Sequence, residues 1–251
     1  MVDVRAFGGP TALIEFGGLR FLTDPTFDEP GDYPLPRGDF LTKTAPAAIT
    51  PDELGPVDVV LLSHDQHPDN LDHSGRRLLS QVPLTLTTTS GAGRLGGAAR
   101  GLEPWASVDL DRPGGGSLTV TAVPARHGPE GSEPLVGDVI GFVLSGDGLP
   151  TVYVSGDNAS LDLVKQIAGR FGPVDTAVLF AGAVRAAWLD NALLTIDSAQ
   201  AAEAAIILGA RQIVPVHHDS WAHFTEGREL LAEAFAKADL TDRVHWPTPH
   251  S

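Results

Sequence analysis

The strongest constraint on the fold is a set of short, almost continuously apolar runs, each followed directly by polar residues. Residues 57–62 (VDVVLL), 174–180 and 212–216 are of this kind. Such runs are typical of strands that are buried on both faces, because a half-exposed strand alternates apolar and polar residues. A strand of this type needs helices or a second sheet over each face, so the chain predicts an α/β architecture.

The remaining sequence predicts grouped strands first and then strands that alternate with helices. Further strands are predicted at residues 2–7, 12–16, 20–22, 84–88, 118–123, 139–144 and 151–154. Helices are predicted at residues 161–171, at 197–208, where Asp197 and Gln200 form a capping box, and at 228–238. Residues 28–43 are rich in Pro and Gly and predict a long loop. No linker interrupts this pattern, so we expect a single domain over residues 1–251, with two mixed sheets flanked by helices.

Composition excludes several classes of protein. The absence of cysteine removes disulfide frameworks, thiol nucleophiles, zinc ribbons and iron–sulfur clusters. A formal net charge of −15 argues against nucleic acid or an anionic membrane as a partner. The N-terminus lacks the basic and apolar regions of a signal peptide, and the most apolar stretches are too short to span a bilayer. We therefore expect a cytoplasmic protein.

Metal-competent side chains follow four of the predicted strands. The candidates are His64, His67, Asp69, His127, Asp157 and His217. Sites in α/β sheets form at the carboxyl ends of strands, so these side chains can converge although they lie far apart in sequence. A lone histidine at a strand end is more often an ordinary surface or core residue, by a rough ratio of 4:1. Several together favour a metal site with an open position that activates water, with Zn²⁺ as the first choice and Mn²⁺ or Fe as competitors.

Five sequence segments carry a resemblance to a known family. They are residues 22–25 (LTDP), 63–72 (SHDQHPDNLD), 124–127 (PARH), 153–157 (YVSGD) and 214–217 (VPVH). In these segments the chain resembles the metallo-β-lactamase fold superfamily, particularly the branch of ascorbate-6-phosphate lactonases and other small prokaryotic metal-dependent hydrolases. The resemblance implies a four-layer αβ/βα sandwich of two mixed β-sheets flanked by helices. It also implies hydrolysis of a small-molecule lactone, amide or phosphoester by metal-activated water, with a lactone slightly favoured.

The resemblance also implies roles for individual residues. Three histidines would bind the first metal: His64, His67 and His127. Asp157 would bridge two metals, and His217 and Asp69 would bind the second. Asp69 and Asp157 are therefore the implied catalytic carboxylates, and Asp69 would also orient the attacking water and accept its proton.

The first motif departs from the pattern of the family, which is His-x-His-x-Asp-His. Aligning His67 and Asp69 with the second His and the Asp of that pattern requires one inserted residue, which keeps Leu71 and Asp72 in phase. Asn70 then stands where a ligand of the second metal is expected. An amide oxygen is a weaker ligand than imidazole, so this alignment predicts a second site that is weak, differently built or empty.

Four other residues are secondary candidates near these motifs. Asp24 follows a strand and is interpreted about equally as a carboxylate that holds a ligand histidine or as a turn residue before Pro25. Asp65 could replace a missing ligand, although a solvated loop carboxylate is the favoured interpretation. His73 is interpreted as a surface residue, and His218 as a reserve for its neighbour.

Two further groups of residues could face a substrate. Trp221 and His223 resemble a pocket segment of the related hydrolases, with simple packing of the aromatic ring under a loop as an equal alternative. Arg126, Arg185 and Trp188 could face a substrate, and Arg185, which interrupts an apolar stretch, could supply a charge for an anionic group. We favour the interpretation that these arginines are solvated or paired with surface carboxylates.

The leading functional hypothesis is a metal-dependent hydrolase that acts on a small molecule. The alternative is a metal- or ligand-binding protein of the same fold with weak or lost catalysis, which Asn70 and the inserted residue motivate. A di-iron redox enzyme ranks last, because the first motif lacks the extra carboxylate. The sequence leaves homo-oligomerisation open.

Overall fold

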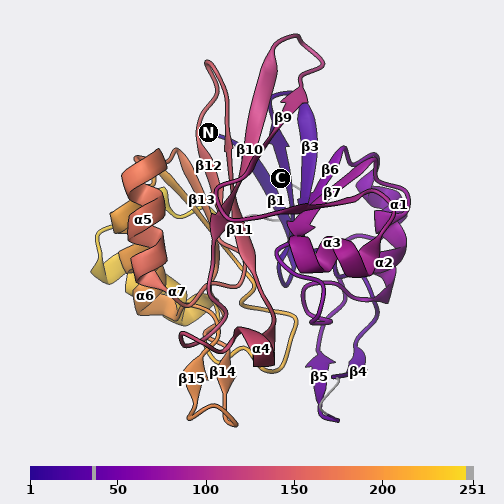
Figure 1. Ribbon diagram of the computed structural model, residues 1–251. Coiled ribbons are helices and arrows are strands. Elements are labelled where there is room, and N and C mark those ends of the chain that lie inside the picture. Colours follow the sequence, from indigo (N-terminus) through magenta and orange to yellow (C-terminus); the bar gives the residue numbers. More distant parts are fainter. Residues whose placement is uncertain (36–37, 247–251) are drawn as a thin grey trace.

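Alternating hydrophobic residues of the strands point to two different cores, and this alternation organises the whole molecule. In the computed structural model, which describes residues 1–35 and 38–246, Phe21 packs into a core between two sheets, while its neighbour Leu22 packs into a core beneath helices. Two six-stranded sheets stand face to face in the middle of the molecule, and helices cover their outer faces (Figure 1). The predicted arrangement of two mixed sheets flanked by helices is confirmed.

The first sheet is antiparallel at one edge and parallel at the other. Its order is β1 (Asp3–Gly8), β2 (Thr11–Phe16), β3 (Leu19–Thr23), β6 (Val59–Leu61), β7 (Leu84–Thr88) and β8 (Ala99–Leu102). The first three strands form an antiparallel meander, and β3, β6, β7 and β8 pair in parallel. Parallel pairing brings the carboxyl ends of β3 and β6 to the same edge of this sheet.

The second sheet combines the same two kinds of pairing. Its order is β16 (Gln212–Val216), β13 (Thr176–Phe180), β12 (Val152–Val154), β11 (Ile140–Ser145), β10 (Ser117–Pro124) and β9 (Ser107–Asp111). The strands β16, β13 and β12 are parallel, whereas β12, β11, β10 and β9 are antiparallel. The carboxyl ends of β12 and β16 therefore lie at one edge of the sheet.

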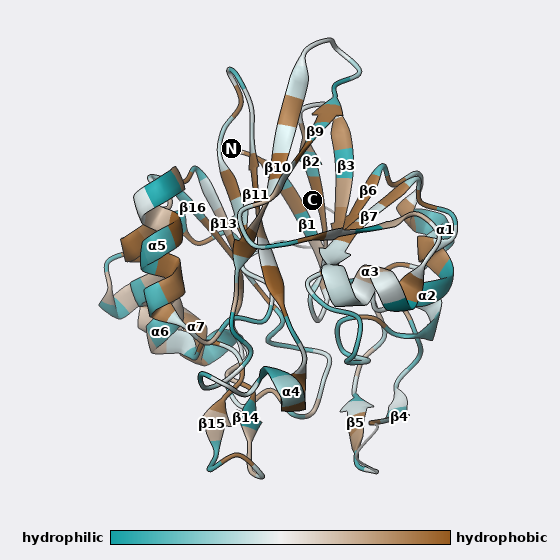
Figure 2. Cartoon of the chain, viewed as in Figure 1, coloured by the Kyte–Doolittle hydropathy of each residue, from teal (hydrophilic) through white to brown (hydrophobic). Residues whose placement is uncertain are grey.

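Helices form the two outer layers. On one side lie α1 (Pro51–Leu54), α2 (His73–Leu79) and α3 (Thr89–Leu95); on the other lie α5 (Leu161–Phe171), α6 (Ser198–Leu208) and α7 (Arg228–Lys237). The capping box of Asp197 and Gln200 is present, and it begins α6 as predicted. Hydrophobic residues run along the strands of both sheets, whereas the outer helices also carry hydrophilic residues (Figure 2). Burial between sheets and helices therefore follows the patterns in the sequence.

The prediction of a long loop at residues 28–43 is wrong for much of that stretch. It contains an antiparallel hairpin of β4 (Gly31–Pro34) and β5 (Phe40–Lys43), while residues 36–37 lie outside the described part. A second small hairpin joins β14 (Arg185–Ala186) to β15 (Ala192–Leu193), and a short helix, α4 (Glu133–Val136), precedes β11. Both hairpins and α4 lie at the same end of the molecule (Figure 1). Among the described helices, none has the length and apolar character needed to cross a bilayer.

Candidate metal centre

Loops that follow four strands bring all six predicted ligand residues to one place. The segment after β6 carries His64, His67 and Asp69, and His127, Asp157 and His217 follow β10, β12 and β16. These side chains form two groups of three, and within each group the candidate ligand atoms lie within 4.8 Å of one another. The first triad is His64, His67 and His127, and the second triad is Asp69, Asp157 and His217.

Three imidazole rings face one another in the first triad. Their ring centroids are separated by 4.8 to 5.3 Å, and His64 Nε2 lies 2.9 Å from His67 Nδ1. The backbone carbonyl of Leu194 lies 2.9 Å from His127 Nδ1, so this nitrogen carries the hydrogen in the neutral ring and Nε2 keeps its lone pair. Burial, and secondarily His127, lowers the pKa of His67 to about 4. The rings of His64 and His67 are therefore neutral at pH 7, as metal binding requires.

The second triad places one histidine between two carboxylates. His217 Nδ1 lies 2.9 Å from Asp157 Oδ1, and His217 Nε2 lies 3.3 Å from Asp69 Oδ2. A left-handed backbone conformation, with φ of 58°, turns His217 sharply out of β16 toward them. Burial disfavours protonation of His217, but the charges of Asp157 and Asp69 outweigh burial and raise its pKa to about 10. In the metal-free chain this histidine is an imidazolium that neutralises part of the buried negative charge.

Several buried atoms of the second triad make no hydrogen bond of acceptable geometry among the described residues, although ion-pair contacts join His217 to both carboxylates. They are Asp69 Oδ1, Asp157 Oδ1, His217 Nδ1 and His217 Nε2. Buried polar groups of native proteins are normally satisfied, so a cluster of unsatisfied ones indicates a missing group. Three imidazoles beside two carboxylates and a fourth imidazole form a nitrogen and oxygen donor set that suits Zn²⁺, Mn²⁺ or Fe. The two triads therefore fit the divalent metals that the sequence predicts.

A buried carboxylate, Asp24, lies beneath the first triad. Asp24 Oδ1 accepts from the Ser63 backbone N–H at 2.6 Å, and Asp24 Oδ2 accepts from Ser63 Oγ at 2.5 Å and from Asn70 Nδ2 at 3.0 Å. Because Ser63 Oγ donates its hydrogen to Asp24, it accepts from His64 Nδ1, 3.0 Å away, and leaves a lone pair on His64 Nε2. Burial raises the pKa of Asp24 to about 7. Asp24 thus orients a histidine through a serine, which is the first of its two interpreted roles.

Three of the secondary candidates, Asp65, His73 and His218, lie outside the two triads. Asp65 forms an ion pair with Arg94, with a shortest contact of 2.6 Å. The ring of His218 packs edge-on against Trp246, with centroids 5.9 Å apart. His73 is at the surface, and its Nδ1 lies 2.9 Å from an oxygen of Asp28. None of these three side chains belongs to either triad.

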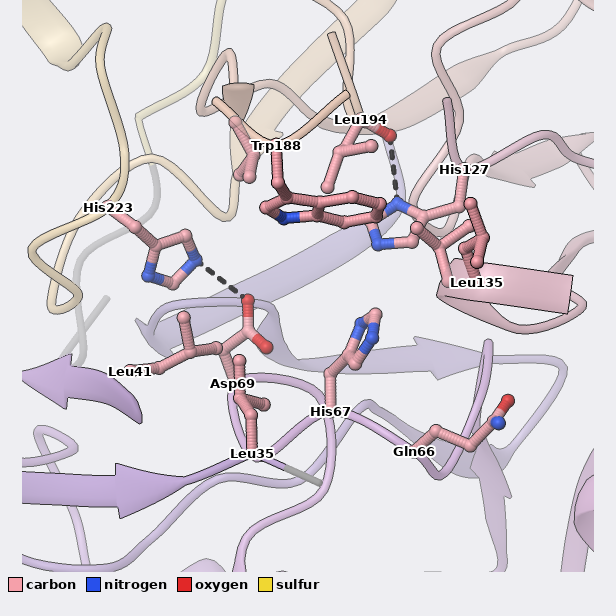
Figure 3. A pocket seen from close by; sticks show the side chains of 12 residues that line it. Leu35, Leu41, Gln66, His67, Asp69, His127, Leu135, Trp188, Leu194 and His223 are labelled. Carbon is pink, nitrogen blue, oxygen red and sulfur yellow. Dashed lines mark hydrogen bonds and ion pairs between the residues drawn. The ribbon is translucent and has the colours of Figure 1, made fainter. Parts of the chain in front are cut away.

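One histidine beyond the predicted set reaches the second triad. His223 Nε2 lies 3.0 Å from Asp69 Oδ2, and the ring lines the adjoining pocket (Figure 3). Burial disfavours ionisation of Asp69, but its interactions with His223 and His217 hold its pKa well below the usual value. The sequence marked Trp221 and His223 as a candidate pocket segment but did not pair His223 with Asp69. No spacing rule connects two residues that are 154 positions apart.

A pocket of about 220 Å³ opens over both triads, with His67, Asp69 and His127 at its base. Its walls come from the β4–β5 hairpin, α4 and the β14–β15 segment, and Figure 3 shows Trp188 and leucine side chains around the metal-competent groups. The apolar wall residues are Leu35, Leu41, Leu135, Val136, Val184, Trp188 and Leu194. Arg126 and Arg185 are not among the lining residues; Arg126 instead lies 3.8 Å from Glu130. Only Trp188 of those three candidates therefore faces the pocket.

Comparison with known proteins connects this geometry to a family. Over 187 residues the chain is 28% identical to a UPF0173 metal-dependent hydrolase from Methanosphaerula palustris, a match that covers 72% of this chain and 77% of the relative. It is 24% identical over 225 residues to a UPF0173 metal-dependent hydrolase from Pyrococcus abyssi, with 88% and 86% covered.

Solved structures share the fold at low sequence identity. An isothiocyanate hydrolase from Delia radicum gut bacteria superposes with a TM-score of 0.82 at 20% identity, covering 99% of this chain and 97% of the other. A possible metal-dependent hydrolase from Veillonella parvula gives a TM-score of 0.83 at 17% identity, with 100% and 98% covered. Residues 19–218 match the β-lactamase superfamily domain. That match includes both triads and most of the chain, and the protein therefore belongs to the β-lactamase superfamily.

Proposed function

We propose that the chain is a metal-dependent hydrolase in which residues 1–251 act as one domain and the two triads hold one or two divalent ions, with Zn²⁺ as the first choice. The observation that carries this proposal is the pairing of three convergent imidazoles with a buried group of two carboxylates and one histidine at the base of a pocket. The related proteins from Methanosphaerula palustris and Pyrococcus abyssi are named as metal-dependent hydrolases, which supports it.

The residues of the site divide the work of hydrolysis. Divalent ions, when bound, supply Lewis acidity that lowers the pKa of water and polarises a carbonyl group. His64, His67 and His127 hold the first ion; His217, Asp69 and Asp157 hold the second, and Asp157 also faces the first triad, 3.7 Å from His127 Nδ1. Asp69 lines the pocket, where it can orient a water molecule and accept its proton. Its low pKa keeps it ionised and able to do so at neutral pH.

The walls of the pocket favour an uncharged, partly apolar substrate. Leucine, valine and tryptophan side chains dominate the lining, and none of the described lining residues is Lys or Arg. A phosphoryl group remote from the metal centre would lose its hydration without gaining a cationic partner. We therefore favour a lactone, ester or amide of a small apolar molecule over a phosphorylated substrate.

Activity measurements on metal-depleted protein test this proposal. We expect chelation to abolish hydrolysis of neutral apolar lactones and aryl esters, and Zn²⁺ or Mn²⁺ to restore it. A matched panel should give kcat/KM values at least tenfold higher for a neutral alkyl lactone than for the same lactone with a phosphate group. Full activity without metal contradicts the proposal. Stoichiometric metal binding without hydrolysis of any panel member supports the alternative of a binding protein with lost catalysis.

A further inference from the structure

The two triads differ in their number of imidazole donors: the first has three and the second has one. The asymmetry follows from Asn70, which occupies the position where an additional histidine is expected. Asn70 is fully buried, and its amide Nδ2 donates to Asp24 Oδ2 at 3.0 Å. Its Oδ1 has no hydrogen-bond partner among the described residues. The amide nitrogen thus belongs to the network beneath His64, and the weak amide oxygen is all that Asn70 offers to a cation.

An imidazole from a different part of the chain approaches the same triad. His223 Nε2 lies 3.0 Å from Asp69 Oδ2, the oxygen that His217 Nε2 approaches at 3.3 Å. One carboxylate oxygen is therefore shared by two imidazole nitrogens, both from the loop that follows β16. Figure 3 shows the His223 ring directed at Asp69 from the opposite side of the pocket to His67.

The backbone around His223 is held in place by the segment that follows β13 (Thr176–Phe180). Thr225 donates from its backbone N–H to the Gly182 carbonyl at 2.9 Å and from Oγ1 to the Ala183 carbonyl at 2.6 Å. The ring of Phe224 contacts the rings of both His217 and His223, with centroids 4.6 Å apart in each case. The side chain of His223 is 19% exposed and stands at the boundary between core and pocket. A ring held this firmly is suited to ligation, because little conformational entropy remains to be lost.

We propose that His223 replaces the missing histidine as a ligand of the second metal position, which is thus completed by the loop after β16. The donor set of this position becomes two imidazoles and two carboxylates, from His217, His223, Asp69 and Asp157. This inference depends on the proposed function only in requiring that the site binds metal. It makes the second position differently built, which is one of the three outcomes that Asn70 predicts.

Metal stoichiometry and affinity, measured without substrate, test the assignment. Metal-free protein is titrated with Co²⁺, whose visible absorption reports each ion, and bound metal is counted by elemental analysis. We expect two ions in the wild type. In His223→Ala the first ion should bind as in the wild type, and the dissociation constant of the second should rise about 100-fold or more, since loss of an outer-shell contact alone costs 10–100-fold. His218→Ala is the matched control: it removes a neighbouring half-buried histidine that packs against Trp246 and should leave both ions bound.

A second variant separates ligation from simple positioning of Asp69. Gln at position 223 retains an amide that can donate to Asp69 but is a poor ligand, so His223→Gln should also lose the second ion. This variant also serves if His223→Ala folds poorly, because its amide still offers a hydrogen-bond donor to Asp69. Wild-type affinity for the second ion in either His223 variant overturns the assignment. The assignment is also overturned if Asn70→Ala loses the second ion while both His223 variants keep it. A single ion in the wild type overturns it while leaving the hydrolase intact, and no bound ion refutes the proposed function itself.

Discussion

The relay from Asp24 through Ser63 to His64 yields a sharp prediction about zinc affinity. Asp24→Asn keeps the shape of the side chain and can keep the oxygen that accepts the Ser63 backbone N–H. Its new NH₂ group then faces Ser63 Oγ, which is within 2.5 Å of the present carboxylate oxygen. Ser63 can no longer donate there, so its hydrogen turns to His64 Nδ1, 3.0 Å away. His64 is then forced into the tautomer with hydrogen on Nε2, the nitrogen that faces the first triad.

The size of the effect follows from the contacts that are exchanged. A hydrogen bond to a charged group contributes about 1.5–3 kcal/mol, and loss of an outer-shell partner typically lowers metal affinity 10–100-fold. We therefore expect Asp24→Asn to weaken zinc binding at the first triad by about 10–100-fold. Competition with a chromophoric chelator at pH 8.5 measures this affinity under conditions where Asp24 is ionised, because its pKa is about 7.

A double-mutant cycle isolates the relay from other consequences of the substitution. In Ser63→Ala the hydroxyl that connects Asp24 to His64 is absent, so Asp24→Asn should lower zinc affinity by less than about threefold in that background. Thermal unfolding of each metal-free variant checks that the fold is retained. If Asp24→Asn weakens zinc binding equally with and without the Ser63 hydroxyl, the relay does not exist and the reasoning is refuted.

Three further predictions address pH, packing and proton release. Burial raises the pKa of Asp24 in the folded chain to about 7, so the folded chain binds a proton more tightly than the unfolded chain does. The free energy of unfolding, measured with denaturant, should therefore fall by about 4 kcal/mol at most as pH rises from 4 to 7, and this fall should be absent in Asp24→Asn. Gly182→Ala would place Cβ 2.3 Å from the His217 carbonyl oxygen and should lower the free energy of unfolding by about 1–3 kcal/mol. Gly93→Ala on α3, where no atom lies within 4 Å of the new Cβ, should raise it by about 0.5–1 kcal/mol in the same assay. Calorimetry at pH 8 in two buffers should detect release of the His217 proton, beyond any proton lost from metal-bound water, when the second triad binds Zn²⁺, because the pKa of His217 is raised to about 10. Filling the first triad should release no proton from the rings of His64 and His67, because their pKa values are lowered.

Elements with local sequence signals were predicted well. The boundaries of α5 match the predicted helix at residues 161–171, since its apolar spacing and the Gly172 and Pro173 stop signal are local. The β4–β5 hairpin was missed because most of its residues are exposed or half-buried and show no apolar pattern, and its Pro and Gly content is that of a loop. Helix α3 was missed because its sequence, TSGAGRL, has weak helix propensity; a side-chain cap from Thr88 compensates.

The candidate site was predictable only where residues follow buried strands. His64, His127 and His217 stand directly after strand signals, so their convergence follows from topology. The pairing of Asp65 with Arg94 and the approach of His223 to Asp69 are contacts between distant segments, which no periodicity encodes. The roles of the ligand residues stay predictions until metal binding is measured.

The contact between Leu194 and His127 has a consequence for how substrate range can diverge in such a molecule. The side chain of Leu194 forms part of the pocket wall, while its carbonyl accepts from the His127 ring and its N–H donates to the Val184 carbonyl at 2.7 Å. A substitution that preserves the packing of these buried side chains leaves the Leu194 carbonyl in place beside the imidazole, whereas a deletion or an altered turn would move it. Evolution and engineering can therefore exchange the residues that the substrate meets, provided that the backbone course from β14 to Leu194 is inherited intact.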